Sequence, residues 1–292
     1  MKIVILSRNP SLYSTRSLYR AAESRGHQVE VVDHMQCDMI VQDGFLEVYY
    51  LGGKISDVDA IIPRIGNSAT SHGSAVIRQF ECSGVYTTMG SSALLCARDK
   101  LICLQMLAGA EIGVPRTVIP KNYYTMPSMI DRLGSEPFVI KLMKGTHGLG
   151  VILSESRKNA EAILETFFKT NQKAMLQEFI EEAKGADIRV LIVDDEIVGV
   201  MKRQAAVGEF RSNLHRGGSS FIDILTEEEE EIAIKAAKTM GLKVAGVDML
   251  RSSRGPLILE VNASPGLEGI ETTTKVDIAG KIIDMIERNA KV

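Results

Sequence analysis

Oxygen-bearing side chains gather in two apolar segments near the C-terminus. Asp248 lies in the run VAGVDML, Glu260 and Asn262 lie in LILEVN, and a short polar stretch separates the two runs. Successive side chains of a strand point to opposite faces, so Glu260 and Asn262 share one face, and an antiparallel partner can place Asp248 opposite them. The pattern predicts a hairpin on which three oxygen ligands converge.

These three side chains favour a hard divalent cation. The flanking Val, Leu and Ile residues predict that both carboxylates are buried, and a buried ionised carboxylate is costly unless it is paired or binds a metal. Oxygen donors without Cys or His suit Mg²⁺ or Mn²⁺ that holds a substrate polyphosphate. A salt-bridged pair of strands is the alternative that these residues alone leave open.

A glycine-rich segment is a second candidate for phosphate binding. Gly145, Gly148 and Gly150 have the spacing G-x-x-G-x-G between two strand-like runs, FVIKLM and VILSE. This position excludes a Walker loop, which precedes a helix and needs G-K-[ST]. A glycine hairpin can fold over phosphates and offer backbone N–H groups, although glycines also collect in ordinary turns.

Basic residues follow the same segments. Lys141 lies inside FVIKLM, where an ammonium without an anion is disfavoured, so a phosphate is its natural partner; a strand-edge lysine that reaches solvent is the alternative. Lys100 by itself is an ordinary charge at a helix start. Arg189, Arg203 and Arg211 recur on or near successive strands, and several arginines opposite a metal would neutralise a polyanion and stabilise transferring charge. Any single one could equally pair with a surface glutamate.

Composition excludes several classes of protein. The 292 residues are 45% hydrophobic with a formal net charge of −3, and no cluster of basic and aromatic residues indicates direct nucleic-acid binding. No apolar run approaches the length of a membrane span or signal-peptide core, so we expect no membrane association and a cytoplasmic location. The four cysteines lack C-x-x-C spacing, which favours free thiols. His147 and His215 have no identifiable partner and receive no role.

Strand and helix patterns divide the chain into two predicted domains. Residues 1–96 alternate strands at 2–6, 28–33 and 58–64 with helices, the first ending at Gly26, which predicts an α/β domain with a parallel sheet. Residues 97–292 form an α+β domain with lobes at about 97–180 and 181–292. Its expected helices cover 99–110, 126–133, 157–169 and 227–240.

The order of these motifs resembles the ATP-grasp fold and, more narrowly, the RimK family of ribosomal protein glutamate ligases. The resemblance is carried by Lys100, Lys141, the glycine loop at 145–150 and the segments QEFIEEAKGADIR, RSNLHRGG, VAGVDMLR and LEVNASPGLEGIE. It spans nearly the whole chain, because residues 1–96 resemble the pre-ATP-grasp domain of that family.

The resemblance implies a nucleotide site between two lobes. ATP would have Lys100 and Lys141 on its phosphates, Glu178, Phe179 and Ile180 at the adenine, and Asp187 near the ribose. Arg211 and Asn213 would complete this site. Asp248, Glu260 and Asn262 would hold two Mg²⁺ or Mn²⁺ ions, and Arg203 and Arg211 are the expected catalytic residues.

The implied reaction adds L-glutamate to the C-terminus of a ribosomal protein through an acylphosphate, with release of ADP and phosphate. Arg64 and Arg216 are candidates for holding substrate carboxylates, and family analogy implies a homo-oligomer, a tetramer. Two alternatives remain at this point. One is an ATP-grasp ligase that joins an amino acid to a small molecule or carrier protein, and the other is a nucleotide-binding regulator without catalysis.

Overall fold

The computed structural model describes residues 1–134, 136–143, 150–212, 214 and 217–290. Within these residues, no helix combines the length and the hydropathy that a bilayer-crossing segment needs. All four cysteines are free thiols, as predicted.

A parallel sheet forms the centre of the N-terminal third of the chain. Its strand order is β2-β1-β6-β7, and every neighbouring pair is parallel, which confirms the predicted α/β arrangement. The elements are β1 (Lys2–Leu6), α1 (Tyr13–Glu23), β2 (Gln28–Val32), η1 (His34–Gln36), β6 (Ala60–Pro63), η2 (Asn67–Ala69), α2 (Thr70–Cys82) and β7 (Tyr86–Thr87). Gly26 follows α1 with φ +78°, a conformation that glycine adopts without strain.

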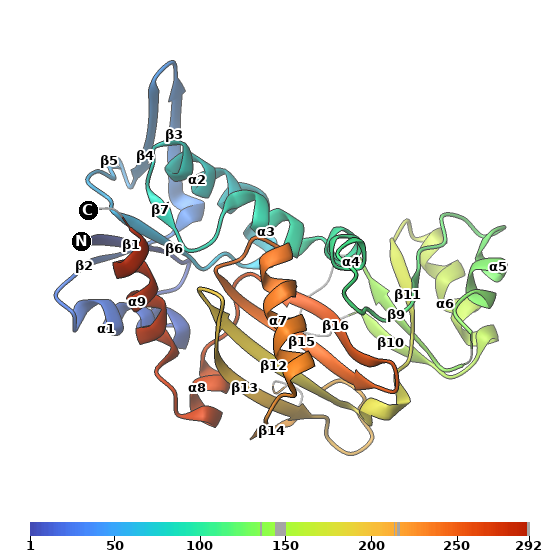
Figure 1. Ribbon diagram of the computed structural model, residues 1–292. Coiled ribbons are helices and arrows are strands. Elements are labelled where there is room, and N and C mark those ends of the chain that lie inside the picture. The colour runs from blue at the N-terminus through green and yellow to red at the C-terminus, as the bar shows by residue number, and fades with distance from the viewer. Residues whose placement is uncertain (135, 144–149, 213, 215–216, 291–292) are drawn as a thin grey trace.

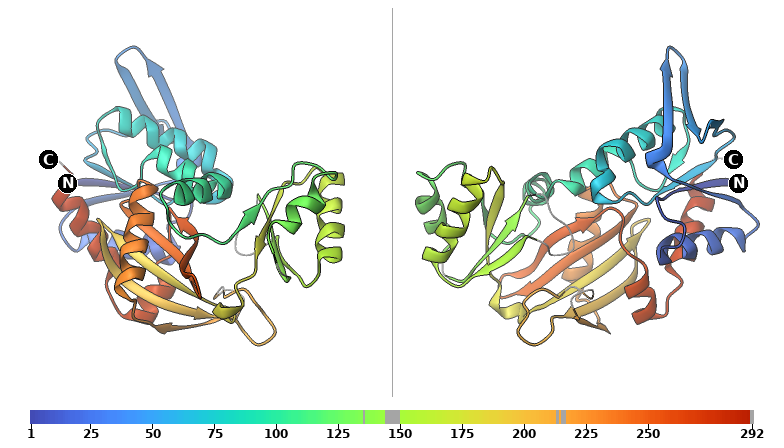
Figure 2. Two further views of the ribbon diagram at one scale, coloured as in Figure 1. Left: turned by 45° about the vertical axis from the view of Figure 1, so that its right-hand side comes forward. Right: turned by 180° about the vertical axis from the view of Figure 1, so that it is seen from behind.

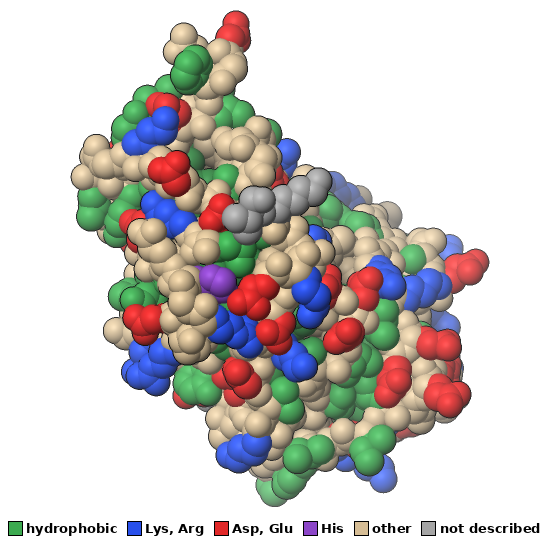
Figure 3. Space-filling model, turned by 60° about the vertical axis from the view of Figure 1, so that its left-hand side comes forward, with side chains coloured by type: hydrophobic (Ala, Val, Ile, Leu, Met, Phe, Trp, Pro, Cys, Tyr) green, Lys and Arg blue, Asp and Glu red, His purple; other side chains and the backbone are tan. Residues whose placement is uncertain are grey.

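An antiparallel arm interrupts this α/β pattern and was not predicted. β3 (Cys37–Gln42) pairs with β4 (Phe45–Tyr50), which also pairs with β5 (Gly53–Lys54). The arm projects from the body of the molecule (Figure 1). Its tip exposes Ile40, Val41 and Phe45. The space-filling view shows the arm at the top, and acidic and basic side chains are intermingled over the face below it (Figure 3).

A central lobe follows the N-terminal domain. Its sheet has the order β10-β9-β11-β8, and its neighbouring strands are antiparallel. The elements are β8 (Thr117–Val118), α5 (Met126–Asp131), β9 (Phe138–Leu142), β10 (Val151–Ser154), α6 (Arg157–Lys169) and β11 (Ala174–Glu178). α5 and α6 cover one face of the sheet, around a core that includes Phe138, Ile140, Leu164 and Leu176. Two views show the lobe standing apart from the rest of the molecule (Figures 1 and 2).

The C-terminal lobe contains the larger antiparallel sheet, with the order β14-β13-β12-β15-β16. Two helices, α3 (Ser91–Arg98) and α4 (Lys100–Gly109), precede the central lobe in the chain. The elements of the C-terminal lobe are η3 (Glu181–Ala183), β12 (Ala186–Val193), β13 (Glu196–Gln204), β14 (Ser219–Ile222), α7 (Glu227–Thr239), β15 (Val244–Ser252), β16 (Gly255–Asn262), α8 (Glu268–Thr274) and α9 (Ile278–Asn289). The sequence predicted α4, α7 and the strands β12, β13, β15 and β16 but did not predict α8 or α9.

The N-terminal domain and the C-terminal lobe share their hydrophobic cores. Val4 and Ile61 belong to one cluster with Val247 and Ile258, and a second cluster joins Leu18 of α1 to α9. α9 accordingly lies beside α1 (Figure 1). The two ends of the chain therefore form one packed unit, whereas the central lobe has a core of its own.

Candidate functional site

The predicted convergence on the β15–β16 hairpin is present in the structure. Asp248 is paired with Glu260 and Gly246 with Asn262, so the three polar side chains share one face of the sheet. The Nδ2 of Asn262 lies 3.2 Å from Glu260 Oε1 and 3.4 Å from Asp248 Oδ2. A Cβ at Gly246 would lie 2.8 Å from Pro265, so the position requires glycine. Two carboxylates and an amide thus occupy a space that one cation could span.

The expected burial of both carboxylates is wrong for Glu260. Asp248 is only 2% exposed because β15 lies between β12 and β16, whereas Glu260 lies on the edge strand β16 and is exposed. One ligand candidate is therefore part of the folded sheet and the other is open to solvent.

Arginines neutralise the buried carboxylate. Arg189 is paired with Asp248 across β12 and β15 and donates Nε to Oδ1 at 2.6 Å and Nη2 to Oδ2 at 2.5 Å. Arg203 lies 2.9 Å from the same Oδ2 and holds Asp187 through Nε and Nη2 at 2.7 and 2.5 Å. The salt-bridged alternative therefore describes Asp248, but among the described residues no ion pair reaches Glu260.

These pairs set the ionisation of the network. Burial alone would raise the pKa of Asp248, but Arg189 and Arg203 outweigh burial and hold the pKa well below its ordinary value. Burial would lower the pKa of Arg203, and Asp248 and Asp187 raise it instead. Both shifts favour the charged forms of Asp248 and Arg203.

Two lysines lie close enough for their charges to interact, and the charge of one of them, Lys141, also interacts with those of Glu260 and Asp248. Lys141 lies on β9 opposite Val151 and Met175, and burial and Lys100 lower its pKa, against the opposing effect of Glu260 and Asp248. Within the described residues, no hydrogen bond or ion pair reaches its ammonium. Lys100 begins α4 and donates to the carbonyl of Met143 at 3.4 Å. The predicted lysines and the predicted oxygen ligands therefore come together.

The segment after β11 connects the two lobes. The Glu178 carboxylate accepts from the Arg116 backbone N at 2.6 Å. Phe179 packs edge-to-face against Phe210 at a centroid distance of 6.5 Å, and Ile180 is 6% exposed. These residues form an apolar border with a polar end, which is the character that the edge and face of a purine base require.

Arg211 ties the C-terminal lobe to the central lobe. It donates Nε and Nη2 to Glu209 at 2.9 and 2.7 Å, and Nη1 to the Val151 carbonyl of β10 at 3.3 Å. Gly150 beside it has φ +75°, and a Cβ there would lie 2.7 Å from Leu142. The other residues predicted for this region, Gly145, Gly148, Asn213 and Arg216, lie outside the described residues, as do His147 and His215, for which no role was predicted.

The donor set fits a divalent cation bound together with a polyphosphate. Among the described residues, no three His, Cys, Asp or Glu side chains form a metal cluster, so the candidate rests on Asp248, Glu260 and the amide of Asn262. Oxygen donors of this kind suit Mg²⁺ or Mn²⁺. The facing lysines supply positive charge where a triphosphate would need it.

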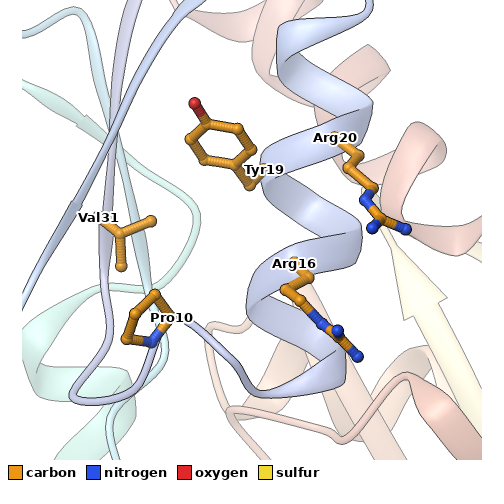
Figure 4. Close-up of a pocket in the computed structure, with 5 residues that line it drawn as sticks. All are labelled: Pro10, Arg16, Tyr19, Arg20 and Val31. Carbon is orange, nitrogen blue, oxygen red and sulfur yellow. The ribbon is translucent and has the colours of Figure 1, made fainter.

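A separate surface pocket lacks this chemistry. It measures about 240 Å³ and is lined by Pro10, Arg16, Tyr19, Arg20 and Val31. Tyr19 points toward the side of Pro10 and Val31, whereas both arginines extend away from it (Figure 4). No polar groups converge there, so this pocket is not the candidate site.

Sequence reasoning missed one residue of this region. Arg98, the last residue of α3, donates to the carbonyl of Ile65, and its charge interacts with that of Glu260. The sequence Arg98-Asp99-Lys100 looks like any helix start, so no local signal distinguishes it. Arg64, which the sequence singled out, lies beside it and donates to the Pro265 carbonyl at 2.8 Å.

Solved structures first define the class of the protein. The chain aligns over its full length with 98% of the ATP-grasp ligase PsnB complexed with minimal precursor, Mg and ADP, at a TM-score of 0.76 and 20% identity. It also aligns over 99% of its length with 97% of D-alanine–D-alanine ligase from Bacillus anthracis complexed with ATP, at a TM-score of 0.70 and 19% identity. At this identity the likeness establishes the ATP-grasp fold.

Sequence comparisons then define the family. Residues 97–286 match the RimK-like ATP-grasp domain and residues 1–94 match the RimK PreATP-grasp domain. The chain therefore belongs to the RimK family and is an ATP-dependent ligase. It is 51% identical over 291 residues, 100% of this chain and 97% of the relative, to a probable alpha-L-glutamate ligase of Ectopseudomonas mendocina. A protein of the same name from Pseudoalteromonas translucida is 52% identical over 99% of this chain and 96% of its own length.

Proposed function

We propose that this ligase adds L-glutamate to the C-terminus of a ribosomal protein through an acylphosphate, with release of ADP and phosphate. The observation that carries the ligase chemistry is the group of oxygen donors formed by Glu260, Asp248 and Asn262, with the charge of Lys141 from the central lobe acting on both carboxylates. The choice of glutamate is supported by relatives that are named probable alpha-L-glutamate ligases and of which 96–97% of the length aligns with this chain.

ATP would lie between the lobes. Its phosphates would contact Lys100, Lys141 and the backbone of the glycine segment that includes Gly150. The adenine would lie at Glu178, Phe179 and Ile180, the ribose near Asp187, and Arg189, Arg211 and Asn213 would border the nucleotide. Asp187 is held by Arg203 in this structure, so its contact with a ribose would be made by the outer face of an already positioned carboxylate.

Asp248, Glu260 and Asn262 would hold two Mg²⁺ or Mn²⁺ ions. Bound divalent ions polarise phosphoryl oxygens and neutralise charge that develops during transfer. Arg203 is the proposed stabiliser of the transferring phosphoryl group. Its Nη2 lies on Asp248 here, and a cation on that carboxylate would compete for the contact.

The proposed reaction has two steps. A terminal carboxylate oxygen of the acceptor attacks the γ-phosphorus, the bond from phosphorus to the ADP oxygen breaks, and an acylphosphate forms. The amino nitrogen of glutamate then attacks the acyl carbon and loses a proton. The carbon–oxygen bond to phosphate breaks, and an amide remains.

Mass spectrometry of a ribosomal extract incubated with the protein, ATP, metal and glutamate tests this proposal. We expect one protein to gain one or more glutamyl residues at its C-terminus, and no gain when ATP or glutamate is omitted. Release of ADP that requires a small-molecule or carrier acceptor instead would contradict the ribosomal acceptor while retaining the ligase. We also propose the homo-tetramer that family analogy implies, and light scattering of the purified protein tests it.

A further inference from the structure

Two arginines of the N-terminal domain lie together beside the candidate site. Arg64 follows β6 at the carboxyl end of the parallel sheet, the edge at which open α/β sheets bind ligands. Its Nη2 donates to the Pro265 carbonyl at 2.8 Å, just after the strand that carries Glu260. Arg98 donates to the carbonyl of Ile65, the neighbour of Arg64, so both guanidinium groups border the same loop.

In the described part of the chain no carboxylate contacts this pair, although the charge of Glu260 acts on Arg98. Among the described residues, no carboxylate makes a hydrogen bond or ion pair with Arg64 or Arg98, and the buried Arg98 Nε has no partner. Burial, together with the charge of Arg98, lowers the pKa of Arg64 to about 10. The buried Arg203 in the same molecule contacts two carboxylates. Two desolvated cations side by side are costly without an anion between them.

We propose that Arg64 and Arg98 form a subsite for a carboxylate of a reactant. This inference rests on the proposed function and names where one of its carboxylates binds. Guanidinium groups are planar and present paired donors that match a carboxylate. Because the charge of Glu260 acts on Arg98, a carboxylate bound to this pair would lie next to the proposed metal ligands. The carboxylate comes from glutamate or from the acceptor, and the experiment separates these sources.

The test compares Arg64→Met and Arg98→Met with Arg20→Met. Arg20 is an exposed arginine of α1 in the same domain and serves as the matched control (Figure 4). Steady-state kinetics give the KM for glutamate, for an acceptor peptide and for ATP. We expect the KM of one carboxylate substrate to rise about 10- to 100-fold in both variants, with the KM for ATP unchanged. Arg98→Lys, which keeps the charge but loses the paired donors, should give an intermediate rise.

The identity of the substrate with the raised KM assigns the carboxylate. A rise for glutamate alone assigns it to the incoming amino acid, and a rise for the peptide alone assigns it to the acceptor. An unchanged KM for both, or a rise confined to ATP, overturns the subsite. Circular dichroism and thermal unfolding show whether each variant folds; if Arg64→Met does not, Arg64→Lys takes its place.

A binding measurement separates this inference from the proposed function. Calorimetry with a nonhydrolysable ATP analogue and Mg²⁺ measures the binding of L-glutamate and of a peptide with a free C-terminal carboxylate. Binding to the wild type that both variants lose supports the subsite even if no turnover occurs, in which case only the proposed function fails. Equal binding by the variants and the wild type overturns the subsite even if turnover is normal.

Discussion

The C-terminal sheet and the central lobe hold charge in different ways. In the sheet, Asp248 lies between Arg189 and Arg203, and Arg203 also binds Asp187, so each buried charge has an opposite charge at hydrogen-bond distance. In the central lobe, Lys141 is half-buried, and within the described residues it has no hydrogen bond or ion pair. The first arrangement stabilises the folded protein, whereas the second leaves a cation available for a ligand.

The hydrophobic cores of the two regions also differ. The C-terminal sheet packs against the N-terminal domain in shared clusters, while the central lobe has its own core and stands apart (Figure 2). A lobe with a separate core can change its position relative to its neighbour at small cost. The paired charges therefore belong to the fixed part of the molecule, and Lys141 belongs to the part that can approach it.

Breaking the paired network should have the largest effect on stability. Arg203→Met leaves the carboxylates of Asp187 and Asp248 without one of their partners, and we expect the free energy of unfolding to fall by about 3–5 kcal/mol. Urea denaturation measures this. Arg251→Met, at an ion pair of the same sheet in which the arginine is more exposed, is the control and should cost less. Equal losses in the two variants would refute the structural role of the buried network.

Removing the exposed ligand candidate should separate function from stability. Glu260→Ala should lower turnover more than about 100-fold, equivalent to about 2.7 kcal/mol, because it removes one of the predicted metal contacts. The free energy of unfolding should stay within about 0.5 kcal/mol, since Glu260 is exposed and has no ion pair in the described part of the chain. ADP release and urea denaturation are the two measurements. Glu231→Ala, at an exposed position of α7, should change neither; near-normal turnover of folded Glu260→Ala contradicts the metal site.

Lys141→Met tests whether the charge in the central lobe serves ligand binding and not stability. Binding of ATP should weaken by at least about tenfold, or about 1.4 kcal/mol, because a charged phosphate contact is lost. The free energy of unfolding should be unchanged or higher, since a half-buried cation that has no ion pair among the described residues is replaced by an apolar side chain of similar length. Calorimetric titration with ATP and Mg²⁺ and urea denaturation measure the two quantities. A large loss of stability would show that Lys141 has a structural partner after all.

The sequence allowed the oxygen ligands to be placed on one face because period-two alternation determines which side chains share a face. It did not allow the exposure of Glu260 to be predicted, since apolar flanking residues do not reveal that β16 is an edge strand. It also did not reveal the charge balance of Arg98. Whether a guanidinium has a carboxylate partner depends on the residues that tertiary packing brings near it. The local sequence Arg-Asp-Lys at a helix start gives no information about those residues.

One of the missed elements had a usable signal. The arm of β3 and β4 turns at Asp43-Gly44, and an Asp-Gly pair between alternating apolar residues is a strong indication of a hairpin. The α/β alternation around it drew attention to the crossover pattern instead. The sequence does not indicate where α9 packs, because its partner α1 lies at the other end of the chain and the two helices meet only in the folded protein.

The smallest effect concerns the ion pair next to the contact between the lobes. The hydrogen bonds from Arg211, against the opposing effect of burial, lower the pKa of Glu209 to about 2. A carboxylate with a lowered pKa stabilises the folded state above its ordinary pKa near 4, and this contribution is lost as the pH falls toward 2. Because the pair is partly exposed, we expect no more than about 1 kcal/mol. Urea denaturation of Glu209→Gln and the wild type should therefore differ by this amount at pH 6, and the difference should shrink below pH 4 and be largely lost near pH 2. A difference that persists at the lower pH would mean that Glu209 acts through packing, and that the contact from Arg211 to Val151 does not depend on the ion pair.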